Sequence, residues 1–207
     1  MDADDRNGPF FDSLSLGDVF DQAPSVTLTD GLAATHHAIV GGRFRLALDR
    51  ALSGRVAHAS LVSPSLAWDV SIGQSTLVTQ RAIANLFYRG LRLQRLPAIG
   101  DTLTTRVEIV GLRPAEPKPD RPPRGLVVMR IRTADQQRQP ILDFHRCALL
   151  PARHAVHKQP AGNLSPADGE MSGQDYAAAI AGWDLAAFRA AELDRGAVRV
   201  RDQRDGA

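Results

Sequence analysis

The residues that could do chemistry in this chain are a histidine and a carboxylate beside a run of small apolar residues. His58 stands directly before Ala59 and Ser60, at the entry to an apolar stretch over residues 56–73, and Asp49 comes shortly before it. An imidazole or a carboxylate can move a proton to or from a reacting group. A helix N-terminus with free amides favours an oxygen that carries negative charge. This part of the chain could therefore perform acid–base chemistry.

Other polar residues have ordinary structural explanations. His36 and His37 are adjacent on a predicted helix, about 100° apart around its axis, so they cannot hold one metal ion together. Asp69 interrupts an apolar run, and we expect a loop amide to donate to it because an unpaired buried carboxylate is costly. Asn85 and Tyr88 are three residues apart in a predicted strand, so we expect them on opposite faces. No metal site and no cofactor is expected.

The apolar stretch over residues 56–73 is the element that would position these groups. It is apolar on nearly every side, which is typical of a helix covered by other elements. Pro64 suits a first helical turn, so the pattern predicts an N-cap at Ser60 or Ser63. Gly73 is predicted to end the helix.

An antiparallel meander is predicted after this helix. In the strand-like run 102–112, Leu103, Thr105 and Val107 alternate with polar residues, so they are expected to share one face of the sheet. The proline-rich segment 113–124 is predicted to be a loop between two strands. A buried helix followed by such a meander indicates an α+β fold with the sheet wrapped around the helix. The four strand-like runs are 83–93, 102–112, 126–133 and 141–150.

Shorter elements precede this core. Residues 19–29 are predicted to form a first strand, and Thr29 to cap a helix that begins near Asp30. A second short helix is expected over residues 43–52, before a turn at Ser53 and Gly54.

A helical tail is predicted near the C-terminus, where Ser172 and Asp175 form a capping box. Its apolar stripe includes Trp183, and we expect it to pack on the chain's own sheet or on a partner's. The expected organisation is a domain with a linker, an extension and two disordered ends. These segments are residues 1–8 (disordered), 9–151 (domain), 152–171 (linker), 172–195 (helical extension) and 196–207 (disordered).

Composition excludes several classes of protein. The formal net charge is only +2, and the arginines are scattered among acidic residues, which argues against nucleic-acid binding. Cys147 is the one cysteine, so neither an internal disulfide nor a cysteine-based metal site is possible. The acidic N-terminus and the lack of a long apolar run predict no signal peptide and no membrane segment. We therefore expect a cytoplasmic protein.

Four motifs resemble the MaoC-like dehydratases: FFDSLSLGD, the TLTD helix start, VAHASL and LPAIGDTL. GGRFRLALD and AIANLFYRG are similar to the N-terminal half of the mesaconyl-CoA (2-methylfumaryl-CoA) hydratase type. The resemblance covers residues 9–151 and implies a single hot-dog domain. It also implies a lyase that hydrates enoyl-CoA or dehydrates hydroxyacyl-CoA thioesters without a cofactor.

The resemblance also marks a departure. Active members carry an Asp, four intervening residues and a His, and Gly42 and Ala47 stand at those two positions here. It therefore implies a non-catalytic subunit or half that pairs with a hot-dog partner chain, as a homodimer or as a heterodimer with an Asp-x4-His subunit. The alternative is a self-sufficient hydratase or thioesterase-like enzyme with His58 or Asp49 as a relocated base. The residues expected to bind the acyl-CoA are Arg43, His58, Ala59, Ser60 and Asn85.

Overall fold

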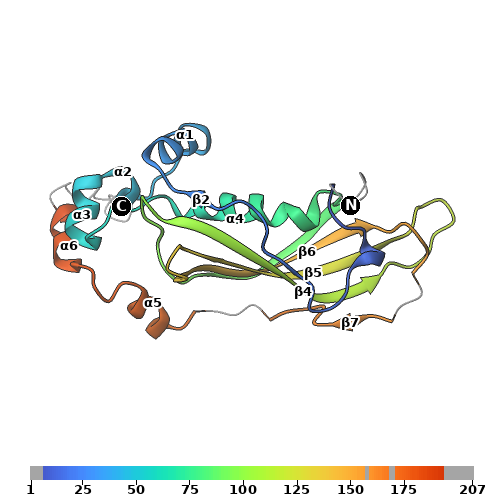
Figure 1. The fold of residues 1–207 in the computed structure, drawn as a ribbon. Coiled ribbons are helices and arrows are strands. Elements are labelled where there is room, and N and C mark those ends of the chain that lie inside the picture. Colours follow the sequence, from blue (N-terminus) through green and yellow to red (C-terminus); the bar gives the residue numbers. More distant parts are fainter. Residues whose placement is uncertain (1–6, 157–158, 168–170, 194–207) are drawn as a thin grey trace, which may run out of the picture.

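A computed structural model describes residues 7–156, 159–167 and 171–193 of the chain (Figure 1). Most of the two ends predicted to be disordered, residues 1–8 and 196–207, lies outside these described residues. The division of the chain into domain, linker and extension therefore remains a prediction.

Helix α4 (Pro64–Thr79) is the central helix of the fold. Pro64 occupies its first turn after the N-cap Ser63, as the sequence predicts. Its sheet-facing residues include Leu66 and Val78, which are almost fully buried. The predicted end at Gly73 is wrong, because the helix continues for six more residues. Packing on the sheet outweighs the low helix propensity of one exposed glycine.

The described residues form seven antiparallel strands. The order across the sheet is β1-β4-β5-β6-β3, and β2 and β7 also pair with β4. Figure 1 shows α4 along one face of the sheet, which confirms the predicted α+β arrangement. The strands are β1 (Val19–Phe20), β2 (Val26–Thr27), β3 (Ala84–Leu93), β4 (Thr102–Pro114), β5 (Arg124–Ala134), β6 (Pro140–Pro151) and β7 (Ala161–Gly162).

The sheet face that meets α4 follows the predicted alternation. Leu103, Thr105 and Val107 of β4 are each no more than 3% exposed. Two buried hydrogen bonds also join sheet and helix: Thr105 donates to Gln74 Oε1 at 2.7 Å, and Thr133 donates to Ser71 Oγ at 2.7 Å. The helix is thus fixed on the sheet by hydrogen bonds as well as by apolar packing.

The two edges of the sheet differ in how they are covered. The single strand predicted over residues 19–29 is wrong, since the chain forms the two short strands β1 and β2 there. Both of them cover β4, and β7 pairs with the same strand. At the opposite edge, β3 pairs with β6 alone among the described residues. One long edge strand is therefore left open.

Three helices lie near the N-terminal end of α4 (Figure 1). Helix α1 (Asp30–Val40) begins after Thr29, whose hydroxyl accepts from the Leu32 amide, as predicted. The single helix predicted over residues 43–52 is instead two, α2 (Arg45–Leu48) and α3 (Arg50–Ala57). Asp49 has extended backbone angles and separates them. The turn predicted at Ser53 and Gly54 is also wrong, because both residues lie inside α3. A 3-10 helix, η2 (Phe11–Ser13), precedes them all.

The C-terminal tail forms α5 (Gly173–Ala179) and α6 (Leu185–Leu193). The capping box of Ser172 and Asp175 is confirmed. Trp183 and Phe188 pack against the buried cluster of α2 and α3, and the Asp184 amide donates to the Val56 carbonyl at 2.8 Å. The tail therefore packs on the chain itself, as expected, but the expectation of its own sheet as the docking surface is wrong, because it packs on the chain's helices.

Candidate functional site

The segment between α3 and α4 holds the predicted substrate-binding residues His58, Ala59 and Ser60. His58 is exposed and ends α3 in the left-handed conformation, with φ of 54°. The buried hydroxyl of Ser53 donates to the Ala59 carbonyl at 2.7 Å and accepts from the Leu61 amide at 2.9 Å. One buried serine therefore fixes the backbone of this segment.

The backbone N–H of Ala59 makes no hydrogen bond within the described part of the chain. The neighbouring Ser60 carbonyl accepts from the Ile99 amide at 2.8 Å, so the segment is held in place on both sides of this amide. A fixed, unused amide suits an oxygen that develops negative charge.

Gly42 and Ala47, the positions where active relatives are expected to have acid–base side chains, lie close by in sequence. Gly42 is in the exposed connection between α1 and α2, and Ala47 is in α2. A β-carbon at Gly42 would stand 3.5 Å from Nδ1 of His37. His37 therefore lies beside Gly42, a contact that sequence spacing alone did not indicate.

Arg43 and Asp49 differ in how far they are committed to the fold. Arg43 is exposed. Asp49 caps α3, because its Oδ1 accepts from the Leu52 amide at 2.9 Å. Of the two, only Arg43 is placed to meet a ligand without loss of a structural hydrogen bond.

His36 of α1 and Asp69 of α4 form a pair, with Nε2 and Oδ2 2.9 Å apart. The Asp69 side chain is 53% exposed and that of His36 only 9%. The expectations of a buried Asp69 and of a loop amide as its partner are both wrong. Asp69 faces outward from α4, where α1 crosses it.

Asn85 and Tyr88 lie on the same face of β3, contrary to prediction. Asn85 is opposite Ala148 and Tyr88 is opposite Arg146, and a register shift separates them. Ala148 and Arg146 are two residues apart on β6, so their side chains point the same way. The extra residue of the bulge changes the alternation of β3.

Asn85 is not beside the other predicted substrate-binding residues. Its Oδ1 accepts two hydrogen bonds from Arg146, at 2.6 and 3.0 Å, and Arg146 Nη1 donates to Ser75 Oγ. Ser75 is eleven residues beyond the first residue of α4, about 16 Å at the rise of an α-helix. The structure thus groups Arg43, His58, Ala59 and Ser60 at one end and leaves Asn85 nearer the other.

Arg146 is a polar residue of this region that the sequence analysis did not select. It is only 5% exposed, and burial lowers the pKa of its guanidinium. Its guanidinium lies over the ring of Tyr88. Tyr88 belongs to an aromatic cluster in which the centroid of the Trp68 ring is 5.4 Å from that of Tyr88 and 4.5 Å from that of Phe144.

A cavity of about 220 Å³ lies between α2 and the tail, next to the Gly42–Ala47 window. Its lining is almost entirely apolar, and it suits an apolar chain rather than a charged group. It is lined by Phe44, Arg45, Leu46, Ile180, Trp183, Leu185 and Phe188.

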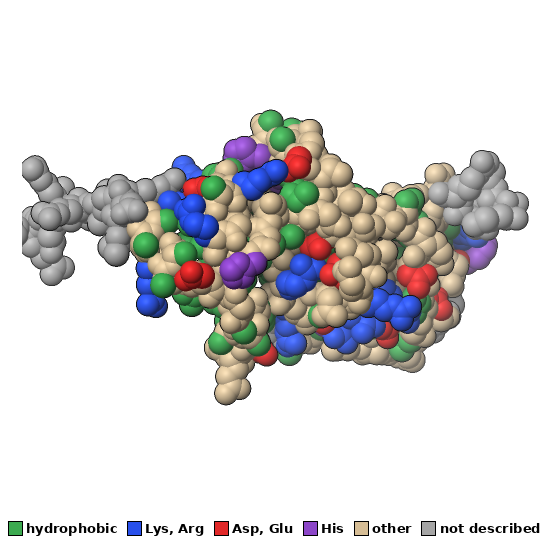
Figure 2. Space-filling view, turned by 60° about the vertical axis from the view of Figure 1, so that its left-hand side comes forward, with side chains coloured by type: hydrophobic (Ala, Val, Ile, Leu, Met, Phe, Trp, Pro, Cys, Tyr) green, Lys and Arg blue, Asp and Glu red, His purple; other side chains and the backbone are tan. Residues whose placement is uncertain are grey.

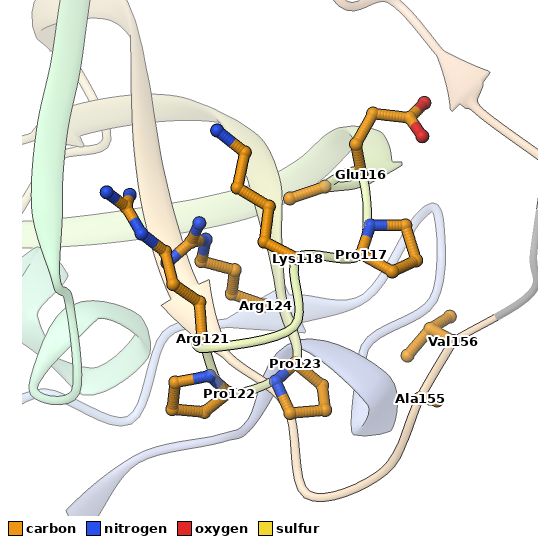
Figure 3. A pocket seen from close by; sticks show the side chains of 10 residues that line it. Glu116, Pro117, Lys118, Arg121, Pro122, Pro123, Arg124, Ala155 and Val156 are labelled. Carbon is orange, nitrogen blue, oxygen red and sulfur yellow. The ribbon is translucent and has the colours of Figure 1, made fainter.

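A second cavity of about 230 Å³ lies on the proline-rich loop between β4 and β5 (Figure 3). The side chains of Lys118 and Arg121 point to one side of the loop, while Glu116 points away. This loop is at the other end of the molecule from α2 and α3 (Figure 1). It is therefore separate from the site at Ala59.

No group of three or more metal-ligating side chains is present among the described residues. On the face shown in Figure 2, acidic and basic side chains are interspersed. None of the described helices is long and apolar enough to cross a membrane.

The architecture is that of a hot-dog protein, and comparison with known proteins agrees. No family model matches the chain. A solved structure of a conserved hypothetical protein from Mycobacterium tuberculosis, described as a double hotdog fold, is 49% identical with a TM-score of 0.77. That match covers 89% of this chain and 57% of the other. The predicted hot-dog fold is confirmed.

Two curated relatives carry the names of acyl-CoA enzymes. β-Methylmalyl-CoA dehydratase of Chloroflexus aurantiacus is 30% identical over 55% of this chain and 33% of its own length. Mesaconyl-CoA hydratase of Cereibacter sphaeroides is 25% identical over 81% of this chain and 48% of its own length. Solved MaoC-like dehydratases share the fold at lower identity. The predicted resemblance is confirmed, and the chain spans half or less of these curated relatives.

Proposed function

We propose that this chain is the non-catalytic hot-dog unit of a two-unit hydratase or dehydratase that acts on enoyl-CoA or hydroxyacyl-CoA thioesters. The observation that carries the proposal is the pair Gly42 and Ala47. Neither residue can accept or donate a proton, whereas hydration needs one proton removed from water and one delivered to the α-carbon.

The retained part of the site supports a role in holding the thioester. The free Ala59 amide, in the segment between α3 and α4, is suited to the thioester oxygen, and the exposed Arg43 is suited to a phosphate of CoA or an acyl carboxylate. His58 and Ser60 complete the proposed contact set. Asn85 would meet only a ligand portion that extends along α4 towards Ser75.

The proposed partner is a second hot-dog unit that supplies the Asp and the His. The relative with a double hotdog fold supports this arrangement, because this chain covers 57% of it. The open β3 edge offers the surface on which such a unit could pair.

The alternative is a self-sufficient hydratase or thioesterase-like enzyme. The exposed His58, directly before the free Ala59 amide, favours it as a relocated base over Asp49, whose carboxylate caps α3. The His36–Asp69 pair adds a carboxylate-bound imidazole on the same half of the molecule.

The decisive experiment measures hydration of short enoyl-CoA thioesters by the purified full chain, by His58→Ala and by Asp49→Asn. We expect the native chain to show no turnover above a buffer control, since a missing general acid or base costs about 10²–10⁴-fold. His154→Ala, at an exposed position on another part of the chain, is the matched control. Native turnover that His58→Ala abolishes and His154→Ala preserves would establish the alternative.

A further inference from the structure

A short turn before β4, residues 96–101, holds the segment between α3 and α4 that carries the free amide. Its Ile99 amide donates to the Ser60 carbonyl at 2.8 Å. Its Pro97 carbonyl accepts from the Val62 amide at 2.9 Å. The position of this segment therefore depends on the position of the turn.

Asp101 closes the turn. Its Oδ2 accepts from the Ala98 amide at 2.8 Å. Arg95, directly before the turn, donates from Nη1 to the same oxygen at 3.1 Å and to the Leu96 carbonyl at 3.2 Å. The guanidinium of Arg95 thus connects the first and the last residue of the turn.

The other terminal nitrogen of Arg95 ties the turn to the sheet. Its Nη2 donates to Oδ2 of Asp135 at 2.7 Å. Asp135 directly follows β5, and its Oδ1 accepts from the amides of Gln137 and Gln139 at 2.9 and 2.8 Å. One guanidinium therefore spans two carboxylates that lie on separate connections of the fold.

This cluster of three charged side chains carries a free-energy cost. The exposed fraction of the side chain is 12% for Asp101, 5% for Asp135 and 32% for Arg95. Nε of Arg95 is buried and makes no hydrogen bond within the described part of the chain. Buried charges with an unsatisfied N–H are a poor source of stability. The cluster is better explained by the geometry that it fixes, because a planar guanidinium holds two acceptors in set directions.

We propose that Arg95 is a positioning residue for the Ala59 amide. It binds the turn at residues 96–101 through Asp101 and anchors that turn on the sheet through Asp135. The turn in turn fixes the direction in which the free amide points. This inference rests on the proposed function, since a ligand oxygen gives the direction of that amide its use. Arg95 acts through the turn and not by contact with the thioester.

Site-resolved amide hydrogen exchange of the full chain, followed by NMR, tests the positioning. In Arg95→Met the amides of Ile99 and Val62 should exchange at least about tenfold faster, because the turn is no longer held in place and opens locally. The Leu52 amide in α3, whose partner does not involve the turn, should keep its native exchange rate. Equal acceleration of all three amides would report a loss of global stability alone and would overturn the proposal, as would unchanged exchange.

Arg130→Met is the matched control. It removes another partly buried arginine from a carboxylate, that of Asp143, and should leave the exchange of the turn unchanged. If Arg95→Met fails to fold, as judged by circular dichroism, Arg95→Lys replaces it with the same expected result. An ammonium group cannot span both carboxylates as the planar guanidinium does.

Butyryl-CoA and its thioether analogue S-butyl-CoA differ in the carbonyl oxygen alone, so the pair probes the amide itself. We expect the native chain to bind butyryl-CoA about tenfold more tightly in calorimetric titration. Arg95→Met should lose this preference and bind the thioether as the native chain does. A preference kept in Arg95→Met would overturn the proposal. Absence of the preference in the native chain would instead refute the thioester role of Ala59, while the exchange rates would still decide whether Arg95 positions the segment.

Discussion

His145 of β6 titrates in a positively charged and partly buried setting. Burial lowers its pKa; Asp143 opposes this shift, and Arg130 and Arg92 add to it. The unfolded chain therefore binds a proton at a higher pH than the folded chain does. Stability is fully present above the unfolded pKa and is lost as pH falls towards the lower folded pKa.

The corresponding variant is His145→Gln. Between about pH 7 and pH 5 the wild-type chain should lose more stability than this variant, because only in the wild type must folding release the proton that His145 binds in the unfolded chain. Urea unfolding at a series of pH values measures the difference. Parallel curves for the two proteins would show that His145 contributes nothing to the acid sensitivity.

At the scale of elements, the continuation of α4 through Gly73 makes a testable claim. A β-carbon at Gly73 would meet no described atom within 4 Å, and the residue lies inside the helix. Gly73→Ala should therefore stabilise the chain by about 0.5–1 kcal/mol in urea unfolding. If the helix instead ended there with a left-handed glycine, the substitution would be destabilising.

Gly125→Ala is the contrasting variant, because its β-carbon would overlap the ring of the buried Phe11. We expect a loss of about 1–3 kcal/mol from this overpacking. If Gly73→Ala and Gly125→Ala changed the stability of the chain by similar amounts, neither the helical position of Gly73 nor the close packing of Gly125 on Phe11 would be supported.

The docking of the tail gives a second prediction for an element. Trp183 is half-buried against the α2–α3 cluster, whereas Tyr176 of α5 is 58% exposed. Trp183→Ala should cost on the order of 1–2 kcal/mol from lost apolar contact, and Tyr176→Ala should be close to neutral. Equal effects, or a native Trp183 emission typical of an indole in water, would show that the tail does not pack.

Local pattern predicted the central helix, the four long strands and the capping box, because apolar periodicity and cap chemistry are local signals. It failed where one residue changed the geometry. The bulge after Asn85 reversed the alternation of β3, and the extended backbone of Asp49 divided one helix into two. Neither event has a periodic signature. Tertiary packing also carried α4 past Gly73, which propensity alone would not predict.

The site was predicted unevenly for a related reason. Resemblance to a family assigned Gly42, Ala47 and the segment around Ala59, because each of these motifs is a short continuous stretch of sequence. The pairing of His36 with Asp69, and that of Asn85 with Arg146, joins residues 33 and 61 positions apart. Contacts at such separations depend on the assembled sheet and helix, so no spacing rule within one segment could indicate them.

At the scale of the whole molecule, the open β3 edge predicts how the isolated chain behaves in solution. Leu86 and Leu91 are 47% and 54% exposed on a strand with unpaired backbone groups. Such an edge promotes self-association through the backbone and apolar side chains.

The variant Leu86→Lys/Leu91→Lys should stay monodisperse at concentrations where the native chain forms larger species. Added lysines on an edge strand oppose pairing, and both side chains are exposed, so the melting temperature should change little. Light scattering during stepwise concentration measures the effect. Leu48→Lys, also on an exposed leucine but in α2, is the matched control and should leave the native aggregation threshold unchanged. If it protects as well as the edge variant, general charge rather than the β3 edge governs the assembly of the chain.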